Sequence, residues 1–215
     1  MARAARLLRY GLAAAFFNAL FLALVAAAPA ERPKIVVLGD SLTAGYGLDL
    51  NQAFPRQLQQ ALALKGVEAE VVNAGVSGDT SAGGLARIGD VLAQHPTAAI
   101  VELGANDALR GLDPERLYAN LDQILTKLDE AKVRVLVAGM RAPPNLGREY
   151  GAEFESVYAR LAEKHHATLY PFFLDGVAAD PSLTQQDGLH PTGEGVSIIV
   201  QRILPSVLKL LGEPA

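Results

Sequence analysis

The stretch KIVVLGDSL, residues 34–42, is a short apolar run that ends in glycine, aspartate and serine. Four further apolar runs follow at residues 69–73, 98–103, 133–139 and 168–170. Longer segments with a helical spacing of apolar residues separate these runs. Such alternation predicts repeated β–α units, and nearly continuous apolar runs are typical of parallel strands covered on both faces. We therefore expect an α/β fold built on a parallel sheet.

The best marked helix begins near residue 113. Asp113 is a typical N-cap and Pro114 a typical first helical residue. Apolar residues then recur on one face, at Leu117, Leu121, Ile124, Leu125 and Leu128. Similar stripes follow Ser81 and Thr192. One stripe in each segment predicts a helix that buries one face against the sheet.

Composition limits the class of protein. The chain has 215 residues, of which half are apolar and a fifth charged, and it has no cysteine. This is typical of one globular domain, and it excludes disulfides and thiolate metal sites. Residues 31–215 have a net charge of −7. Nucleic acid and anionic lipid surfaces are therefore not expected as partners.

The first 30 residues resemble an export signal. Three arginines precede an apolar stretch at residues 11–25, and the small residues at 28–30 form a typical cleavage site. We expect a signal peptide over residues 1–30, a mature domain over residues 31–215 and a periplasmic or secreted protein without a membrane span. The alternative is a retained membrane anchor, because residues 11–28 nearly reach the length that spans a bilayer.

Four loops hold the polar residues that an enzyme could use. They are residues 39–42 (GDSL), 73–80 (NAGVSGDT), 104–107 (GAND) and 187–191 (DGLHP). The first three follow strand runs directly, and the fourth lies in the long loop after the last run. In open parallel sheets, functional groups collect at the carboxyl ends of the strands. We therefore expect these loops to meet along one edge of the sheet.

Each loop can be given a chemical role. Ser41 is a candidate nucleophile, and it needs a base because a free serine reacts poorly. His190 is the candidate base, and Asp187 can orient its imidazole. The backbone N–H groups of Ser41 and Gly78, together with the Asn106 carboxamide, can stabilise an oxyanion.

These four segments resemble the four sequence blocks of the SGNH, or GDSL, hydrolase superfamily. The resemblance extends over NAGVSGDTSAGGLAR (73–87) and VELGANDALRGL (101–112), which are similar to bacterial periplasmic thioesterase I, lysophospholipase L1 and arylesterase enzymes. It implies a flavodoxin-like three-layer αβα fold with five parallel strands in the order 2-1-3-4-5. It also implies hydrolysis of acyl-CoA thioesters, aryl esters and lysophospholipids, with Ser41, Asp187 and His190 as the triad. Ala105 departs from the family, which usually has glycine there.

The substrate expected from this resemblance is a small acyl ester or thioester. No metal or organic cofactor is required, and we expect a monomer. Loops after the third and fourth strands supply apolar candidates for contact with the acyl chain, at Leu109, Leu112, Met140 and Leu146. Leu109 and Met140 are the two whose replacement by a charged residue is expected to impair long-chain esters most.

Other classes of function remain open at this stage. The same loops could form a non-catalytic module that binds an anion at helix N-termini. Alternatively, Asp40, Asp187 and His190 could bind a metal in a phosphoesterase. We interpret His165 and His166 as a helix end, where positive charge complements the helix dipole.

Several acidic and basic residues near the predicted site have a structural interpretation. Asp40 and Asp107 adjoin Ser41 and Asn106 in sequence, and aspartate in turns usually accepts hydrogen bonds from loop amides. We also expect Arg87, Glu102 and Asp79 to connect the loops to one another.

Overall fold

The computed structural model describes residues 32–214. The predicted signal peptide at residues 1–30 lies outside these residues. Within the described part of the chain, no helix is both long and apolar enough to cross a membrane.

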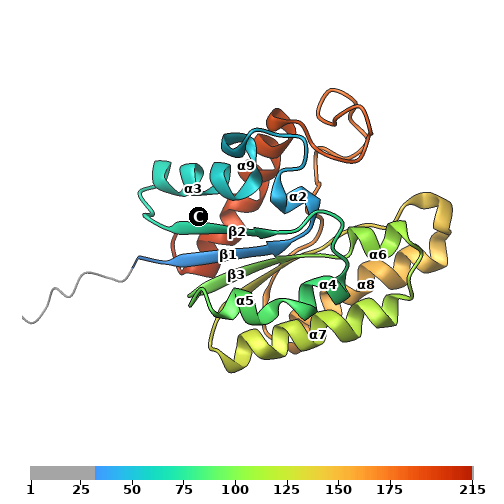
Figure 1. The fold of residues 1–215 in the computed structure, drawn as a ribbon, viewed down its shortest axis with the longest axis horizontal. Coiled ribbons are helices and arrows are strands. Elements are labelled where there is room, and N and C mark those ends of the chain that lie inside the picture. The colour runs from blue at the N-terminus through green and yellow to red at the C-terminus, as the bar shows by residue number, and fades with distance from the viewer. Residues whose placement is uncertain (1–31, 215) are drawn as a thin grey trace, which may run out of the picture. The chain divides into compact units, whose positions relative to one another are not determined.

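A five-stranded, wholly parallel sheet forms the centre of the fold (Figure 1). Its order is β2-β1-β3-β4-β5, as the family resemblance implies. The predicted strands agree with the observed ones to within two residues at each end. The strands are β1 (Lys34–Gly39), β2 (Glu70–Gly75), β3 (Ala98–Glu102), β4 (Arg134–Ala138) and β5 (Thr168–Tyr170).

Helices cover both faces of the sheet, which gives three layers (Figure 1). Helices α3 and α9 pack together on one face, and α4, α5, α7 and α8 lie on the other. Two short helices, α2 and α6, begin directly at strand ends. The helices are α2 (Ser41–Ala44), α3 (Phe54–Leu64), α4 (Ser81–Ala86), α5 (Ile88–Leu92), α6 (Ala105–Leu109), α7 (Pro114–Glu130), α8 (Arg148–Lys164) and α9 (Gly193–Leu211).

Helix α7 shows why the sequence folds as predicted. The Asp113 side chain accepts a hydrogen bond from the backbone N–H of Glu115 at 2.9 Å, and Pro114 is the first helical residue. The five apolar residues of the predicted stripe are all buried. The segment after Ser81 differs from the prediction, because α4 and α5 are separated at Arg87.

The core runs along the sheet and under both helical layers. Residues 35–38 of β1 and 98–100 of β3 have no exposed surface, as expected for strands covered on both faces. Phe54, Phe154 and Phe173 are the largest fully buried side chains. This rigid sheet holds the carboxyl ends of β1, β2 and β3 side by side, which is where the polar loops begin.

Candidate active site

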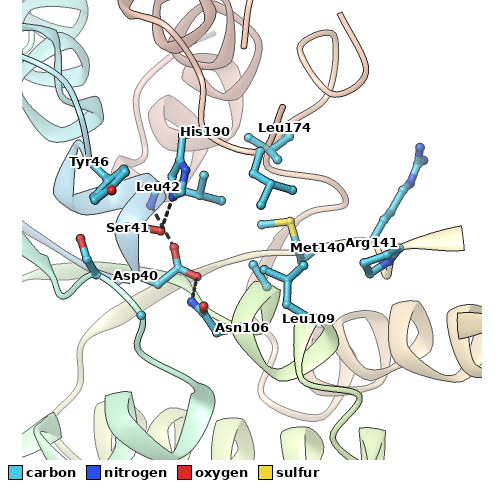
Figure 2. Close-up of a pocket in the computed structure, with 15 residues that line it drawn as sticks. Asp40, Ser41, Leu42, Tyr46, Asn106, Leu109, Met140, Arg141, Leu174 and His190 are labelled. Carbon is cyan, nitrogen blue, oxygen red and sulfur yellow. Dashed lines mark hydrogen bonds between the residues drawn. The ribbon is translucent and has the colours of Figure 1, made fainter. Parts of the chain in front are cut away.

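The predicted nucleophile and base lie in contact at the carboxyl edge of the sheet (Figure 2). Ser41 is the first residue of α2, directly after β1, and His190 lies in the loop that leads to α9. The Nε2 atom of His190 is 2.9 Å from Oγ of Ser41, and its Nδ1 atom is 2.6 Å from Oδ2 of Asp187. With the hydrogen on Nδ1, Nε2 is free to accept the serine proton.

Backbone N–H groups of its own loop hold the Asp187 carboxylate in place. Its Oδ1 atom accepts hydrogen bonds from the backbone N–H groups of Leu189 and His190, at 2.9 and 3.0 Å. These N–H groups, that of His190 first, lower the pKa of Asp187 to about 2. Asp187 is therefore ionised at every pH near neutrality and can orient the imidazole. The ring of Tyr46 packs against the His190 imidazole, with the two ring centres 4.6 Å apart.

The three predicted oxyanion donors line the same pocket as Ser41 and His190. Gly78 has φ of +85°, a left-handed conformation that favours glycine. Within residues 32–214, neither the backbone N–H of Ser41 nor that of Gly78 has a hydrogen-bond acceptor. The Asn106 side chain lies on α6 and points toward Asp40 (Figure 2). All three residues therefore border one space beside the nucleophile.

Arg87 ties the ends of two strands to the loop that contains Gly78. Its guanidinium donates to the carbonyls of Ala74 and Gly39, at 2.6 and 2.8 Å, and to the Asp79 carboxylate at 2.6 Å. Arg110 donates to the Gly78 carbonyl at 2.9 Å. The expected contact between Arg87 and Asp79 is present.

Buried acidic side chains lie beneath the pocket. Asp40 and Glu102 have no exposed surface. Burial raises the pKa of Asp40 to about 6, and burial together with the nearby Asp40 charge raises the pKa of Glu102 well above its usual range. The Thr43 hydroxyl donates to Glu102 at 2.8 Å. A Cβ atom at Gly39 would overlap Thr43 and Glu102, which explains the glycine that precedes Asp40.

The pocket beside Ser41 has a volume of about 280 Å³ and a mostly apolar wall. Leu109 and Met140, two of the four predicted acyl contacts, line this pocket, and Ala105 lies beside Asn106 in its wall. The other apolar residues of this wall are not among the predicted acyl contacts. They are Leu42, Tyr46, Pro143, Leu174 and Leu189.

Known proteins are similar to this chain over most of its length. Residues 37–198 match the GDSL-like lipase/acylhydrolase family. The chain belongs to this family. The arylesterase of Vibrio mimicus is 39% identical over 193 residues, which are 89% of this chain and 96% of the relative.

A thioesterase and an esterase of known structure are also similar to this GDSL-like hydrolase. Thioesterase 1/protease 1/lysophospholipase L1 of Escherichia coli strain K12 is 40% identical over 181 residues, which are 84% of this chain and 86% of the relative. The crystal structure of AlinE4, an SGNH-hydrolase family esterase, is 50% identical, with a TM-score of 0.71 over 86% of this chain and 99% of that one. The chain is an ester hydrolase of the SGNH group.

Two predicted acyl contacts of this hydrolase lie away from the pocket. Leu112 is half-buried, and its carbonyl accepts the Tyr150 hydroxyl at 2.6 Å. Leu146 belongs to a short 3₁₀-helix, Pro144–Leu146, and borders a separate hollow with residues 147–150 and 153. The structure therefore brings together Leu109 and Met140 but not these two. Loop direction decides which side chains face inward, and composition does not reveal it.

The predicted structural residues also have partners. Asp107 accepts hydrogen bonds from the backbone and hydroxyl of Ser81, at 2.8 and 2.6 Å. His165 ends α8 and contacts Asp122 and Asp129. The described residues contain no group of three or more histidine and acidic side chains that could hold a metal.

Proposed function

We propose that this hydrolase cleaves carboxylic esters and thioesters through an acyl-enzyme on Ser41. The observation that carries the proposal is the chain of contacts from Ser41 through His190 to Asp187, at 2.9 and 2.6 Å. A hydroxyl, an imidazole and an ionised carboxylate in this order are the parts needed to activate a serine. The free backbone N–H groups of Ser41 and Gly78 add the stabilisation that an oxyanion needs.

In the first half of the reaction, Oγ of Ser41 attacks the acyl carbon while its proton moves to Nε2 of His190. The carbonyl oxygen becomes an oxyanion beside the N–H groups of Ser41, Gly78 and Asn106. When this intermediate collapses, His190 returns the proton to the departing alcohol or thiol. Water then attacks the acyl-enzyme by the same steps, which releases the acid and restores Ser41.

The pocket and the relatives' names together support an acyl substrate with an apolar chain. The wall beside Ser41 is mostly apolar, so a fatty acyl group is better suited to it than a charged one. One relative is named an arylesterase and another a thioesterase and lysophospholipase. We propose aryl esters, acyl-CoA thioesters and lysophospholipids as the classes to test.

The test is a panel of p-nitrophenyl esters, acyl-CoA thioesters and lysophospholipids, assayed with the wild-type protein and with Ser41→Ala. We expect hydrolysis by the wild type and none above the uncatalysed rate by the variant. A fluorophosphonate probe should modify the wild type at Ser41. An unmodified Ser41 would favour the anion-binding alternative, and activity that persists in Ser41→Ala would refute the acyl-enzyme.

We also propose that the enzyme is exported. The support is the pattern of arginines, apolar residues and small residues in the first 30 positions. N-terminal sequencing of the protein purified from cells that express the full chain tests this. A mature N-terminus near Glu31 is the expected result, and an intact Met1 in the membrane fraction would support the anchor instead.

A further inference from the structure

The third oxyanion donor differs from the other two, because its hydrogens are already engaged. The Asn106 carboxamide has two N–H groups. Its Nδ2 atom lies 3.0 Å from Oδ2 of Asp40 and 2.9 Å from the carbonyl oxygen of Asp79. Before Asn106 can donate to an oxyanion, one of these two hydrogen bonds has to be given up or shared.

The two acceptors are unequal. Asp40 is fully buried, which raises its pKa, while the hydrogen bonds that it accepts from the Leu42 N–H and from Asn106 favour its carboxylate form. A hydrogen bond to a carboxylate is stronger than one to a neutral carbonyl. An oxyanion is charged as well, so it can displace the neutral Asp79 carbonyl more readily than the Asp40 carboxylate.

Asp40 is also anchored on its other side. Its Oδ1 atom accepts the backbone N–H of Leu42 at 2.9 Å, which caps the start of α2 directly after Ser41. One carboxylate therefore connects the helix that carries the nucleophile to the carboxamide on α6 (Figure 2).

We propose that Asp40 is a positioning residue that holds one N–H of Asn106 and so aims the other at the oxyanion, with the Asp79 carbonyl as its resting acceptor. This inference rests on the proposed acyl-enzyme function. It gives Asp40 a role that the turn interpretation did not include. In this role Asp40 transfers no proton itself and affects the reaction through Asn106.

A double-variant cycle tests the proposal. We measure kcat and KM on p-nitrophenyl butyrate for the wild type, Asp40→Ala, Asn106→Ala and the double variant. Asn106→Ala should lower kcat on the order of 10²- to 10³-fold. Asp40→Ala should lower kcat by up to about 10²-fold, the loss that a misplaced catalytic group can cause, with little change in KM. The double variant should be about as slow as Asn106→Ala alone.

The cycle separates the possible failures. If Asp40→Ala lowers kcat by the same factor in both backgrounds, Asp40 acts elsewhere, through the cap on Leu42 for example, and the proposal is overturned. If Asn106→Ala leaves kcat unchanged, the oxyanion role in the proposed function has failed instead. A change confined to KM in Asp40→Ala would also overturn the positioning role.

Two further variants guard against a failure to fold. Asp40→Asn keeps the volume but has one oxygen for two donors, so we expect a partial loss of kcat that again disappears in the Asn106→Ala background. Asp107→Asn is the matched control, because Asp107 is 2% exposed, adjoins Asn106 and accepts from Ser81. Its effect on kcat should be the same in both backgrounds, and a coupling as large as that of Asp40 would overturn the proposal.

Discussion

Each edge of the sheet holds a histidine that contacts an acidic side chain through one ring nitrogen. The two histidines differ in the group that contacts the other ring nitrogen. At the carboxyl edge, His190 has Nδ1 2.6 Å from Asp187 and Nε2 2.9 Å from the Ser41 hydroxyl. At the amino edge, just before β5, His165 has Nδ1 2.5 Å from Asp129 and Nε2 2.7 Å from Asp122.

This difference decides what each histidine can do. A ring nitrogen that faces a carboxylate has to carry its hydrogen in order to donate. His190 has one nitrogen beside the Ser41 hydroxyl, from which it can accept a proton, whereas both nitrogens of His165 lie beside carboxylates. His165 instead joins the end of α8 to two positions on α7, and its side chain is only 7% exposed. We infer that the first histidine serves the reaction and the second serves stability.

The largest expected effect comes from removing the histidine at the carboxyl edge. His190→Ala takes away the base, and loss of the base in a serine triad lowers kcat on the order of 10⁶-fold. Steady-state kinetics on a p-nitrophenyl ester measures this. The matched variant His165→Ala should keep kcat within about twofold of the wild type, since His165 does not line the pocket beside Ser41. Comparable losses in both variants would break the distinction between the two edges.

Removing only the orienting charge should have a smaller effect. Asp187→Asn leaves the size of the side chain unchanged but removes the carboxylate that holds the hydrogen on Nδ1. In a triad of this kind, the wrong tautomer lowers kcat on the order of 10⁴-fold. Thermal unfolding should change little, because the Asp187 side chain is 38% exposed. A kcat close to that of the wild type would mean that the His190 tautomer does not depend on Asp187.

The acids of the two edges should affect stability in opposite directions as pH changes. Burial raises the pKa of Asp40 from 3.8 to about 6, so between these values the folded protein binds a proton that the unfolded chain releases. Stability should therefore fall as pH rises through this window, by on the order of 3 kcal/mol for Asp40 alone. At the amino edge, burial acts to raise the pKa of Asp122, but hydrogen bonds from Lys164 and His165 lower it overall. Asp122 therefore stabilises the fold above its ordinary pKa.

Urea unfolding between pH 4 and pH 7 measures this contrast. Asp40→Asn should reduce the fall in the free energy of unfolding over this range, because position 40 then has no carboxyl to ionise. The buried Glu102, whose pKa is also raised, should keep part of the fall in place. Asp122→Asn should leave the slope above pH 5 nearly unchanged and lower stability throughout. An Asp40→Asn curve parallel to that of the wild type would show that Asp40 is not the group that titrates.

The contacts of His165 should appear in stability alone. His165→Ala removes the close contacts of the ring with two carboxylates and leaves Asp122 and Asp129 without this partner. We expect the free energy of unfolding to fall by about 1–3 kcal/mol, the range for losing bonds of this type. His165→Gln can restore one donor, so its loss should be smaller. Equal stability of His165→Ala and the wild type would show that this histidine does not clamp α8 to α7.

The carboxyl edge was more predictable from sequence than the wall of its pocket. Ser41, Asn106 and Gly78 follow strands directly, so chain order and a parallel sheet suffice to bring them to one edge. His190 lies in a longer loop, yet its residue type and the nearby Asp187 indicated a base. Leu174 and Leu189 carry no such signal, because the direction of a loop side chain depends on tertiary packing. The bond between Asp40 and Asn106 joins residues 66 positions apart, and no local pattern encodes it.

The smallest expected effect concerns the turns of the amino edge. Lys132 links α7 to β4 with φ of +59°, and Gly66 occupies the matching turn between α3 and β2 with φ of +79°. A left-handed conformation costs a residue with a Cβ atom about 1–2 kcal/mol, and glycine avoids this strain. Glycine in turn loses more conformational entropy on folding, which costs about 0.5–1 kcal/mol. Lys132→Gly should therefore raise the free energy of unfolding by up to about 1 kcal/mol in urea titrations.

Gly66→Ala, whose Cβ would meet no atom within 4 Å, should lower the free energy of unfolding by a similar amount. Both variants should keep the wild-type kcat, because these turns lie at the edge of the sheet opposite to Ser41. A destabilised Lys132→Gly would mean that contacts of the lysine side chain outweigh the relief of the backbone.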